Sequence, residues 1–209
     1  MDSPKDGLVS RYINRPVSRP ISRWLARTPV TPNQVSVVSF AAALGSVGLF
    51  VSGNNILAGL VIQASSIIDG VDGDLARRKS MVTRFGGFFD AVLDRYADVA
   101  IFAGLAYWSY AFEGRASVGL IGAAGLMAAV GSFMISYTRA RAEASLGGTF
   151  QGLAGSVAAR DMRLLLVMIG AVTGQALATL ILLAVLTNSV IVWRVALARS
   201  DPSDPGPSQ

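Results

Sequence analysis

The chain has 209 residues, of which 52% are hydrophobic and only 15% are charged, and its mean hydropathy is +0.51. This composition excludes an ordinary water-soluble domain and predicts one all-α, polytopic membrane domain. The chain has no cysteine and no histidine, which excludes disulfides, thiolate or imidazole metal sites, and Ser-His or Cys-His nucleophiles. The net charge of +5 is distributed as in a membrane protein with a basic cytoplasmic side, so no nucleic-acid partner is expected.

Residues 1–30 form a basic N-terminal arm. Arginines recur there at every fourth position, among apolar and aromatic residues: Arg11, Arg15, Arg19, Arg23 and Arg27. This spacing predicts an interfacial segment that anchors the chain to anionic membrane lipids rather than one that binds substrate. Pro16 and Pro20 lack amide donors and disfavour helical geometry just before them, so one unbroken helix is not expected.

Residues 31–200 are predicted to form one domain of six membrane-spanning helices, followed by a disordered tail at 201–209. The first helix starts with Thr31 or Asn33 as its cap. Three more are predicted at about 56–78, 85–112 and 118–141. The last apolar run, 164–193, is too long for one span and is divided near Gly174; its first half then begins near Val157 and is short for a span.

The basic residues support the division into six spans. With six spans, every arginine and lysine outside the helices lies on one side except Arg115, whereas five spans would move Arg194 and Arg199 to the other side. The positive-inside rule makes the basic side cytoplasmic. We therefore expect an integral cell-membrane protein with both termini facing the cytoplasm.

Carboxylates occur in two regularly spaced sets within the second and third predicted helices. Asp69 and Asp72 are three residues apart, and Asp90, Asp94 and Asp98 are four apart, so each set lines one helix face. Rise per residue places Asp69 about 10 Å from the cytoplasmic boundary and Asp94 about 12 Å from it. The two faces should therefore converge, with Asp72 opposite Asp90 and Asp69 opposite Asp94.

Converging carboxylates inside a membrane repel one another and require cations. An all-oxygen ligand set suits Mg²⁺ or Mn²⁺, and the ligand count fits two ions. Arg77 could reach the same cytoplasmic mouth, and metal ions together with an arginine favour a phosphate-bearing substrate. Asp74 points away from the cluster and is given a supporting or solvent-facing role, and Asp98 is expected to pair with Arg95 or another polar group.

These residues resemble, at every fixed position, the signature of the CDP-alcohol phosphotransferase family: Asp69-x2-Asp72-Gly73-x2-Ala76-Arg77-x8-Gly86-x3-Asp90-x3-Asp94. The resemblance implies a six-helix membrane enzyme, commonly a homodimer. Such enzymes transfer a substituted phosphoryl group from a CDP-alcohol to a second alcohol and release CMP. A divalent-cation transporter is the alternative from another class, but the outer halves of the first four helices are largely apolar.

The resemblance also implies roles for individual residues. It assigns two Mg²⁺ or Mn²⁺ ions to Asp69, Asp72, Asp90 and Asp94, and the role of general base to Asp94. It assigns the CDP site to Asp72, Gly73, Arg77 and Gly86.

A second basic group occurs at the cytoplasmic ends of the last three predicted helices: Arg139, Arg141, Arg160, Arg163 and Arg194. Spacing alone leaves two explanations open, positive-inside charge or a phosphorylated acceptor. The segment 136–143 looks like that of family members using inositol phosphate, which implies that Arg139, Arg160 and Arg194 bind the acceptor phosphate.

The donor is less clearly indicated. The segments 65–73 and 160–164 are similar to di-myo-inositol-phosphate-phosphate synthases, which use CDP-inositol. Phosphatidylinositol-phosphate synthases, which use CDP-diacylglycerol, are nearly as similar but usually have Pro-Glu where this chain has Asp161 and Met162. The favoured hypothesis is therefore transfer from CDP-inositol to a phosphorylated polyol, and the lipid donor is the alternative.

Overall fold

The computed structural model describes residues 9–145 and 159–199, and every regular element within these ranges is helical. Two of the elements, labelled η, are single π-helical turns. In chain order the elements are η1 (Ser10–Asn14), α1 (Arg15–Leu25), α2 (Pro32–Val51), α3 (Asn55–Arg78), α4 (Arg84–Trp108), η2 (Ser109–Glu113), α5 (Val118–Ser145), α7 (Arg160–Val172) and α8 (Ala176–Arg199). The predicted all-α class is confirmed for these residues.

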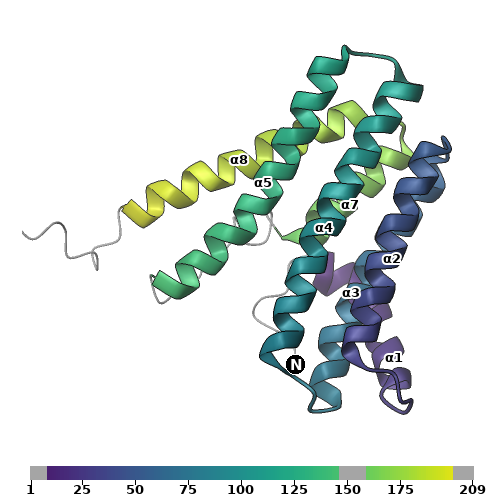
Figure 1. Cartoon of the computed structure of the whole chain (residues 1–209), viewed down its shortest axis with the longest axis vertical. Helices are drawn as coiled ribbons and strands as arrows, with labels where there is room; N and C mark the ends of the chain where they lie inside the picture. The colour runs from purple at the N-terminus through teal and green to yellow at the C-terminus, as the bar shows by residue number, and fades with distance from the viewer. Residues whose placement is uncertain (1–8, 146–158, 200–209) are drawn as a thin grey trace, which may run out of the picture.

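The helices are arranged as two groups. Figure 1 shows α2, α3 and α4 running side by side, while α5 and α8 lean away from them. Helix α2 packs against both α3 and α4, α5 packs against α8, and α7 packs against α3. Helix α1 packs along α3, so residues 15–25 of the N-terminal arm belong to the folded domain.

One apolar cluster joins the long helices to one another. Its largest fully buried side chains include Phe50, Ile62, Phe102, Leu105 and Leu180, which come from α2, α3, α4 and α8. Within the membrane such packing acts through close contact more than through exclusion of water. The cluster holds both α3 and α4 against α2 and thereby sets the relative positions of their carboxylates.

The ends of the helices follow local sequence signals. Thr31 caps α2 in a capping box, in which its side chain accepts from the Gln34 amide and the Gln34 side chain accepts from the Thr31 amide. Thr31 and not Asn33 is therefore the cap. Gly174, with φ +67°, follows the end of α7, and α8 begins at Ala176, which confirms the predicted break.

Four of the described helices are long and apolar enough to span a membrane: α2, α3, α5 and α8. Helix α4 is long enough, with 25 residues, but Asp90, Asp94, Arg95 and Asp98 make it strongly charged. Helix α7 has 13 residues and a length of about 20 Å, less than the ~30 Å of a bilayer core. Six spans therefore remain a prediction. Val157 and the tail 201–209 lie outside the described residues.

The prediction that prolines interrupt the arm was wrong. The backbone is helical from Ser10 to Leu25, with Pro20 inside α1. The π-helical turn η1 ends at Asn14, two residues before Pro16, and such widened turns are one way in which a helix accommodates local disruption. Pro16 lies in the first turn of α1, where a missing amide hydrogen costs little.

The contact between α5 and α8 depends on a glycine. A Cβ atom on Gly131 would lie 2.8 Å from Thr187 Cβ, so α5 and α8 could not keep their present separation. We expect Gly131→Ala to lower the free energy of unfolding by about 2 kcal/mol, read as a lower Tm in detergent. Thr187→Ala removes the hydroxyl that the new Cβ would also meet but keeps the Thr187 Cβ, so it should restore only part of this loss, and Gly122→Ala, where no atom lies within 4 Å, should not lower the Tm. An unchanged Tm for Gly131→Ala would contradict this packing.

Candidate active site

Three aspartates from α3 and α4 converge at the centre of the candidate site. One carboxylate oxygen from each of Asp69, Asp72 and Asp90 lies within 4.8 Å of the other two. Asp72 is buried, and the other two are half-buried. Three hard oxygen donors at this separation suit a divalent cation such as Mg²⁺ or Mn²⁺. The two predicted helix faces therefore do face each other.

Asp94 joins this cluster through an arginine. Arg160 Nη1 lies 3.0 Å from Asp69 Oδ2 and 2.9 Å from Asp94 Oδ1, which places Asp94 beside Asp69, as predicted. Arg95 also approaches Asp94, at 3.4 Å. The fourth predicted metal ligand thus lies next to the three converging carboxylates but outside the set of oxygens within 4.8 Å.

Asp98 lies one turn further along α4 and is almost completely buried. Its two oxygens accept hydrogen bonds from Arg160 Nε at 3.0 Å, Arg163 Nη2 at 3.0 Å and Ser132 Oγ at 2.7 Å. These contacts satisfy a buried charge that would otherwise be very costly. Asp98 therefore pairs with arginines of α7, and Arg95 donates instead to Ser136 and Asp94.

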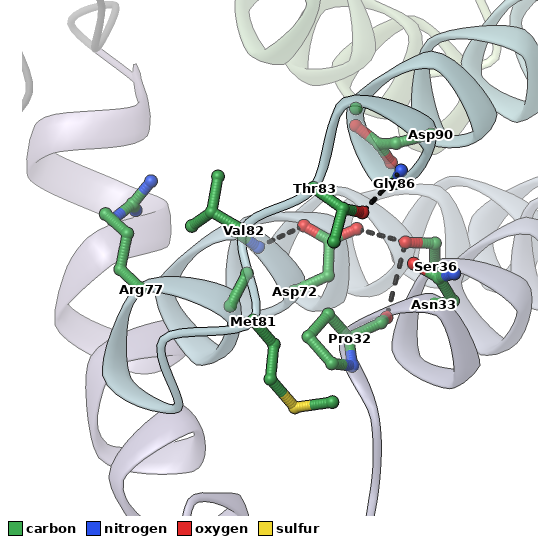
Figure 2. A pocket seen from close by; sticks show the side chains of 13 residues that line it. Pro32, Asn33, Ser36, Asp72, Arg77, Met81, Val82, Thr83, Gly86 and Asp90 are labelled. Atoms are coloured by element: carbon green, nitrogen blue, oxygen red, sulfur yellow. Dashed lines mark hydrogen bonds between the residues drawn. The ribbon is translucent and has the colours of Figure 1, made fainter.

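A pocket of about 530 Å³, counting the space at its mouth, opens beside Asp72 and Asp90 (Figure 2). It lies between the start of α2, the end of α3 and the start of α4. All four residues predicted to form the CDP site line it: Asp72, Gly73, Arg77 and Gly86. The glycines leave room for a ligand to approach the backbone near the carboxylates.

Helix α2 contributes side chains to the site that the carboxylate pattern did not indicate. Ser36 Oγ donates to Asp72 Oδ2 at 2.5 Å, and Asn33 and Thr83 also line the pocket (Figure 2). A usable signal was present, since Ser36 and Ser39 repeat at helical spacing in an otherwise apolar helix. Thr83 also caps α4 by accepting from the Gly86 amide at 2.9 Å.

The three predicted acceptor arginines have different partners. Arg160 contacts Asp69, Asp94 and Asp98. Arg139 is half-exposed at the end of α5 and lies 3.5 Å from Glu143. Arg194 is buried and donates to the Ile135 carbonyl at 2.7 Å and to Thr138 Oγ1 at 3.0 Å. Arg160 thus lies at the carboxylate cluster, and Arg194 ties α8 to α5.

The chain matches the model of the CDP-alcohol phosphatidyltransferase family over residues 29–199 and therefore belongs to this family of transferases. The match spans all the carboxylates and the pocket described above. Because this is a family of enzymes, the transferase hypothesis is favoured over a cation transporter.

Three relatives that are named for an enzymatic activity are similar to this chain in sequence. A bifunctional IPC transferase and DIPP synthase of Rubrobacter xylanophilus is 44% identical over 92% of this chain, which spans only 43% of that protein. An archaetidylinositol phosphate synthase of Pyrococcus horikoshii is 32% identical over 84% of this chain and 87% of its own length. A phosphatidylinositol phosphate synthase of Mycobacteroides abscessus is 37% identical over 79% of this chain and 73% of its own length.

Crystal structures of a phosphatidylinositol phosphate synthase from Mycobacterium tuberculosis have a similar fold. The structure with CDP-DAG bound has a TM-score of 0.76 and 31% identity, and the match covers 93% of this chain and 99% of that one. A second structure of that enzyme, in complex with manganese and citrate, also has a TM-score of 0.76 and 31% identity, covering 92% of this chain and 94% of that one. Manganese binding by a relative agrees with the oxygen-rich cluster of this chain.

The hydrogen bond from Ser36 to Asp72 gives a prediction about metal affinity. Partners that orient a ligating carboxylate typically change metal affinity by about 10- to 100-fold when removed. We expect Ser36→Ala to weaken Mn²⁺ binding by at least tenfold, measured by electron paramagnetic resonance of the free ion. Ser52→Ala, in which an exposed serine just beyond α2 is removed, is the matched control. Equal affinities in the two variants would contradict a supporting role for Ser36.

Proposed function

We propose that the protein transfers a substituted phosphoryl group from CDP-inositol to the hydroxyl of a phosphorylated polyol, with inositol phosphate favoured, and releases CMP. The observation that supports this best is the adjacency of two features. Asp72 and Asp90 belong to the carboxylate cluster and also line the pocket that contains Gly73, Arg77 and Gly86. A nucleoside diphosphate in this pocket would have its phosphates next to the cluster.

The proposed metal ligands are Asp69, Asp72, Asp90 and Asp94, which fit two Mg²⁺ or Mn²⁺ ions by their number and oxygen chemistry. Bound there, the ions would neutralise the diphosphate and the charge on departing CMP. Arg77 would contact a donor phosphate from the rim of the pocket. Arg139, Arg160 and Arg194 are proposed to bind the acceptor phosphate. This requires Arg160 to face both the cluster and the acceptor, and the buried Arg194 to exchange its contacts with Ile135 and Thr138 for the phosphate.

The proposed reaction is a direct displacement at phosphorus. Asp94 accepts the proton of the acceptor hydroxyl. At the same time the acceptor's oxygen forms a bond to the donor's β-phosphorus, and the bond from that phosphorus to the CMP oxygen breaks. The proton stays on Asp94 until solvent removes it, and CMP leaves with the bonding electron pair. No covalent enzyme intermediate is required.

Similarity to the Rubrobacter protein supports the choice of CDP-inositol, although this chain spans less than half of that protein. The alternative is a phosphatidylinositol-phosphate synthase using CDP-diacylglycerol. It is favoured by one specific observation, that the similar Mycobacterium tuberculosis enzyme was crystallised with CDP-DAG. The two donors share the cytidine diphosphate and differ in the group that is transferred.

Release of CMP by purified protein tests the proposal. With Mg²⁺ and inositol phosphate, CDP-inositol should give CMP at a rate at least tenfold above that with CDP-diacylglycerol. The reverse preference would establish the alternative donor. Absence of CMP with either donor and with other CDP-alcohols, together with Mg²⁺ flux into liposomes, would contradict the proposed transferase activity.

We also propose that six helices cross the cell membrane, that the site and both termini face the cytoplasm, and that the enzyme is a homodimer. The absence of native cysteine allows a direct test of topology. A cysteine replacing exposed Gln175, between α7 and α8, should react with a membrane-impermeant maleimide only from outside the cell. One replacing exposed Val82, between α3 and α4, should react only from the cytoplasm, and the opposite labelling would contradict this topology.

A further inference from the structure

The described part of the N-terminal arm is hydrogen-bonded to helix α3 at both ends of α1. Asn14 is buried, donates to Ser66 Oγ at 3.1 Å and accepts from Gln63 Nε2 at 2.8 Å. At the other end of α1, Arg78 Nε donates to Ser22 Oγ at 3.2 Å. A helix that only anchors the chain to lipid would not need these contacts. The arm is therefore fixed to the helix that supplies Asp69 and Asp72.

Between these two ends, one carboxylate joins the arm to the rim of the pocket. Arg15 Nη1 lies 2.9 Å from Asp74 Oδ1 and 3.3 Å from the Gly70 carbonyl oxygen. The same Asp74 oxygen lies 2.5 Å from Arg77 Nη2. Only 12% of the Arg15 side chain and 14% of the Asp74 side chain are exposed, so this contact is largely shielded from solvent.

Arg77 reaches the pocket from this contact. It lines the pocket with 54% of its side chain exposed, and in Figure 2 it lies at the edge nearest the pale purple N-terminal helix. Asp74 has one negative charge for two arginines, so the three groups together retain one positive charge. The Arg77 guanidinium is the exposed member of the group, so an anionic ligand in the pocket can reach it.

We propose that Arg15 and Asp74 are positioning residues for Arg77, and that the N-terminal arm is thereby part of the binding site for the donor's diphosphate. The identity of this ligand rests on the proposed function. Asp74 limits the conformations of the long, flexible Arg77 side chain. Less conformational entropy is then lost when Arg77 binds the diphosphate. Arg15 holds Asp74 in place from a different element.

Affinity for CDP, measured by titration calorimetry with intact protein and Mg²⁺, tests this proposal. Arg15→Gln and Asp74→Asn should each weaken CDP binding by about tenfold, the size of coupling found between contacting residues. Asp74→Asn separates positioning from simple electrostatics, because loss of a negative charge beside the pocket would by itself tighten binding of an anion. Arg23→Gln, on the exposed face of the same helix, is the matched control and should bind CDP as the parent does.

A double-mutant cycle separates positioning from general damage. In an Arg77→Gln background, Asp74→Asn should no longer weaken CDP binding, whereas a purely structural role would weaken binding equally in both backgrounds. Unchanged or tighter CDP binding by Asp74→Asn would overturn the proposal. If Arg15→Gln does not fold, the cycle with Asp74 and Arg77 still decides the result. Failure of the parent protein to bind CDP would overturn both this inference and the proposed function, while normal parent binding with unaffected variants would overturn the inference alone.

Discussion

Asp94→Asn should lower turnover by at least about 100-fold while changing CDP affinity by less than about threefold. An amide has nearly the shape of a carboxylate but cannot accept the acceptor's proton, and general-base catalysis contributes roughly 10²–10⁴ to enzyme rates. Asp94 lies beside Arg160 and Asp69, at the edge of the cluster away from the nucleotide pocket, so donor binding should be largely retained. Rates of CMP release and calorimetric CDP binding measure the two effects separately.

A matched control is available in η2, which follows the far end of α4. Glu113 is another buried carboxylate that accepts from a serine, at 2.8 Å from Ser109 Oγ, and contacts an arginine, Arg115. It lies outside the carboxylate cluster and the pocket, so Glu113→Gln should retain turnover if the protein folds. Full activity of Asp94→Asn would remove Asp94 from the role of base, and loss of CDP binding in that variant would assign it to the donor site instead.

Removal of divalent ions should abolish turnover and weaken CDP binding by at least 100-fold. Without cations, the negative diphosphate would approach Asp72 and Asp90, and two like charges in a partly buried site repel strongly. Chelation with EDTA followed by Mg²⁺ or Mn²⁺ should remove and then restore both CMP release and CDP binding.

The control for chelation is the thermal stability of the protein, measured in parallel. If EDTA unfolds the chain, the loss of activity would be uninformative, and the calorimetric CDP titration would be repeated at a temperature where the apo protein is folded. Turnover that persists in excess EDTA would contradict a metal-dependent mechanism.

The meeting of Asp69, Asp72 and Asp90 could be predicted from the sequence because it depends on local rules. Helical spacing put each set on one face, and the short connection between two apolar helices required them to run antiparallel. The four residues predicted for the CDP site come from the same hairpin, whereas Pro32, Asn33 and Ser36 of the pocket lining come from α2. The break at Gly174 was also local, since a glycine at positive φ ends α7.

The contacts that could not be predicted join segments distant in the sequence. Arg15 and Asp74 are 59 positions apart. Helical spacing indicates only that Asp74 lies off the metal-binding face of its helix and does not indicate which residue it contacts. Arg160 was assigned to the acceptor, yet it contacts three aspartates, because α7 packs against α3 in a way that hydropathy does not specify. Ser36 was missed for the same reason, since its importance depends on how α2 packs against α3.

Crystals grown with Mn²⁺ and CDP test most directly the proposed two-ion site. The anomalous signal of manganese should show two ions among Asp69, Asp72, Asp90 and Asp94, with the diphosphate in contact with at least one of them. Asp72→Asn should lose one or both of these peaks. Manganese bound elsewhere, with none at the cluster in the presence of CDP, would contradict the account.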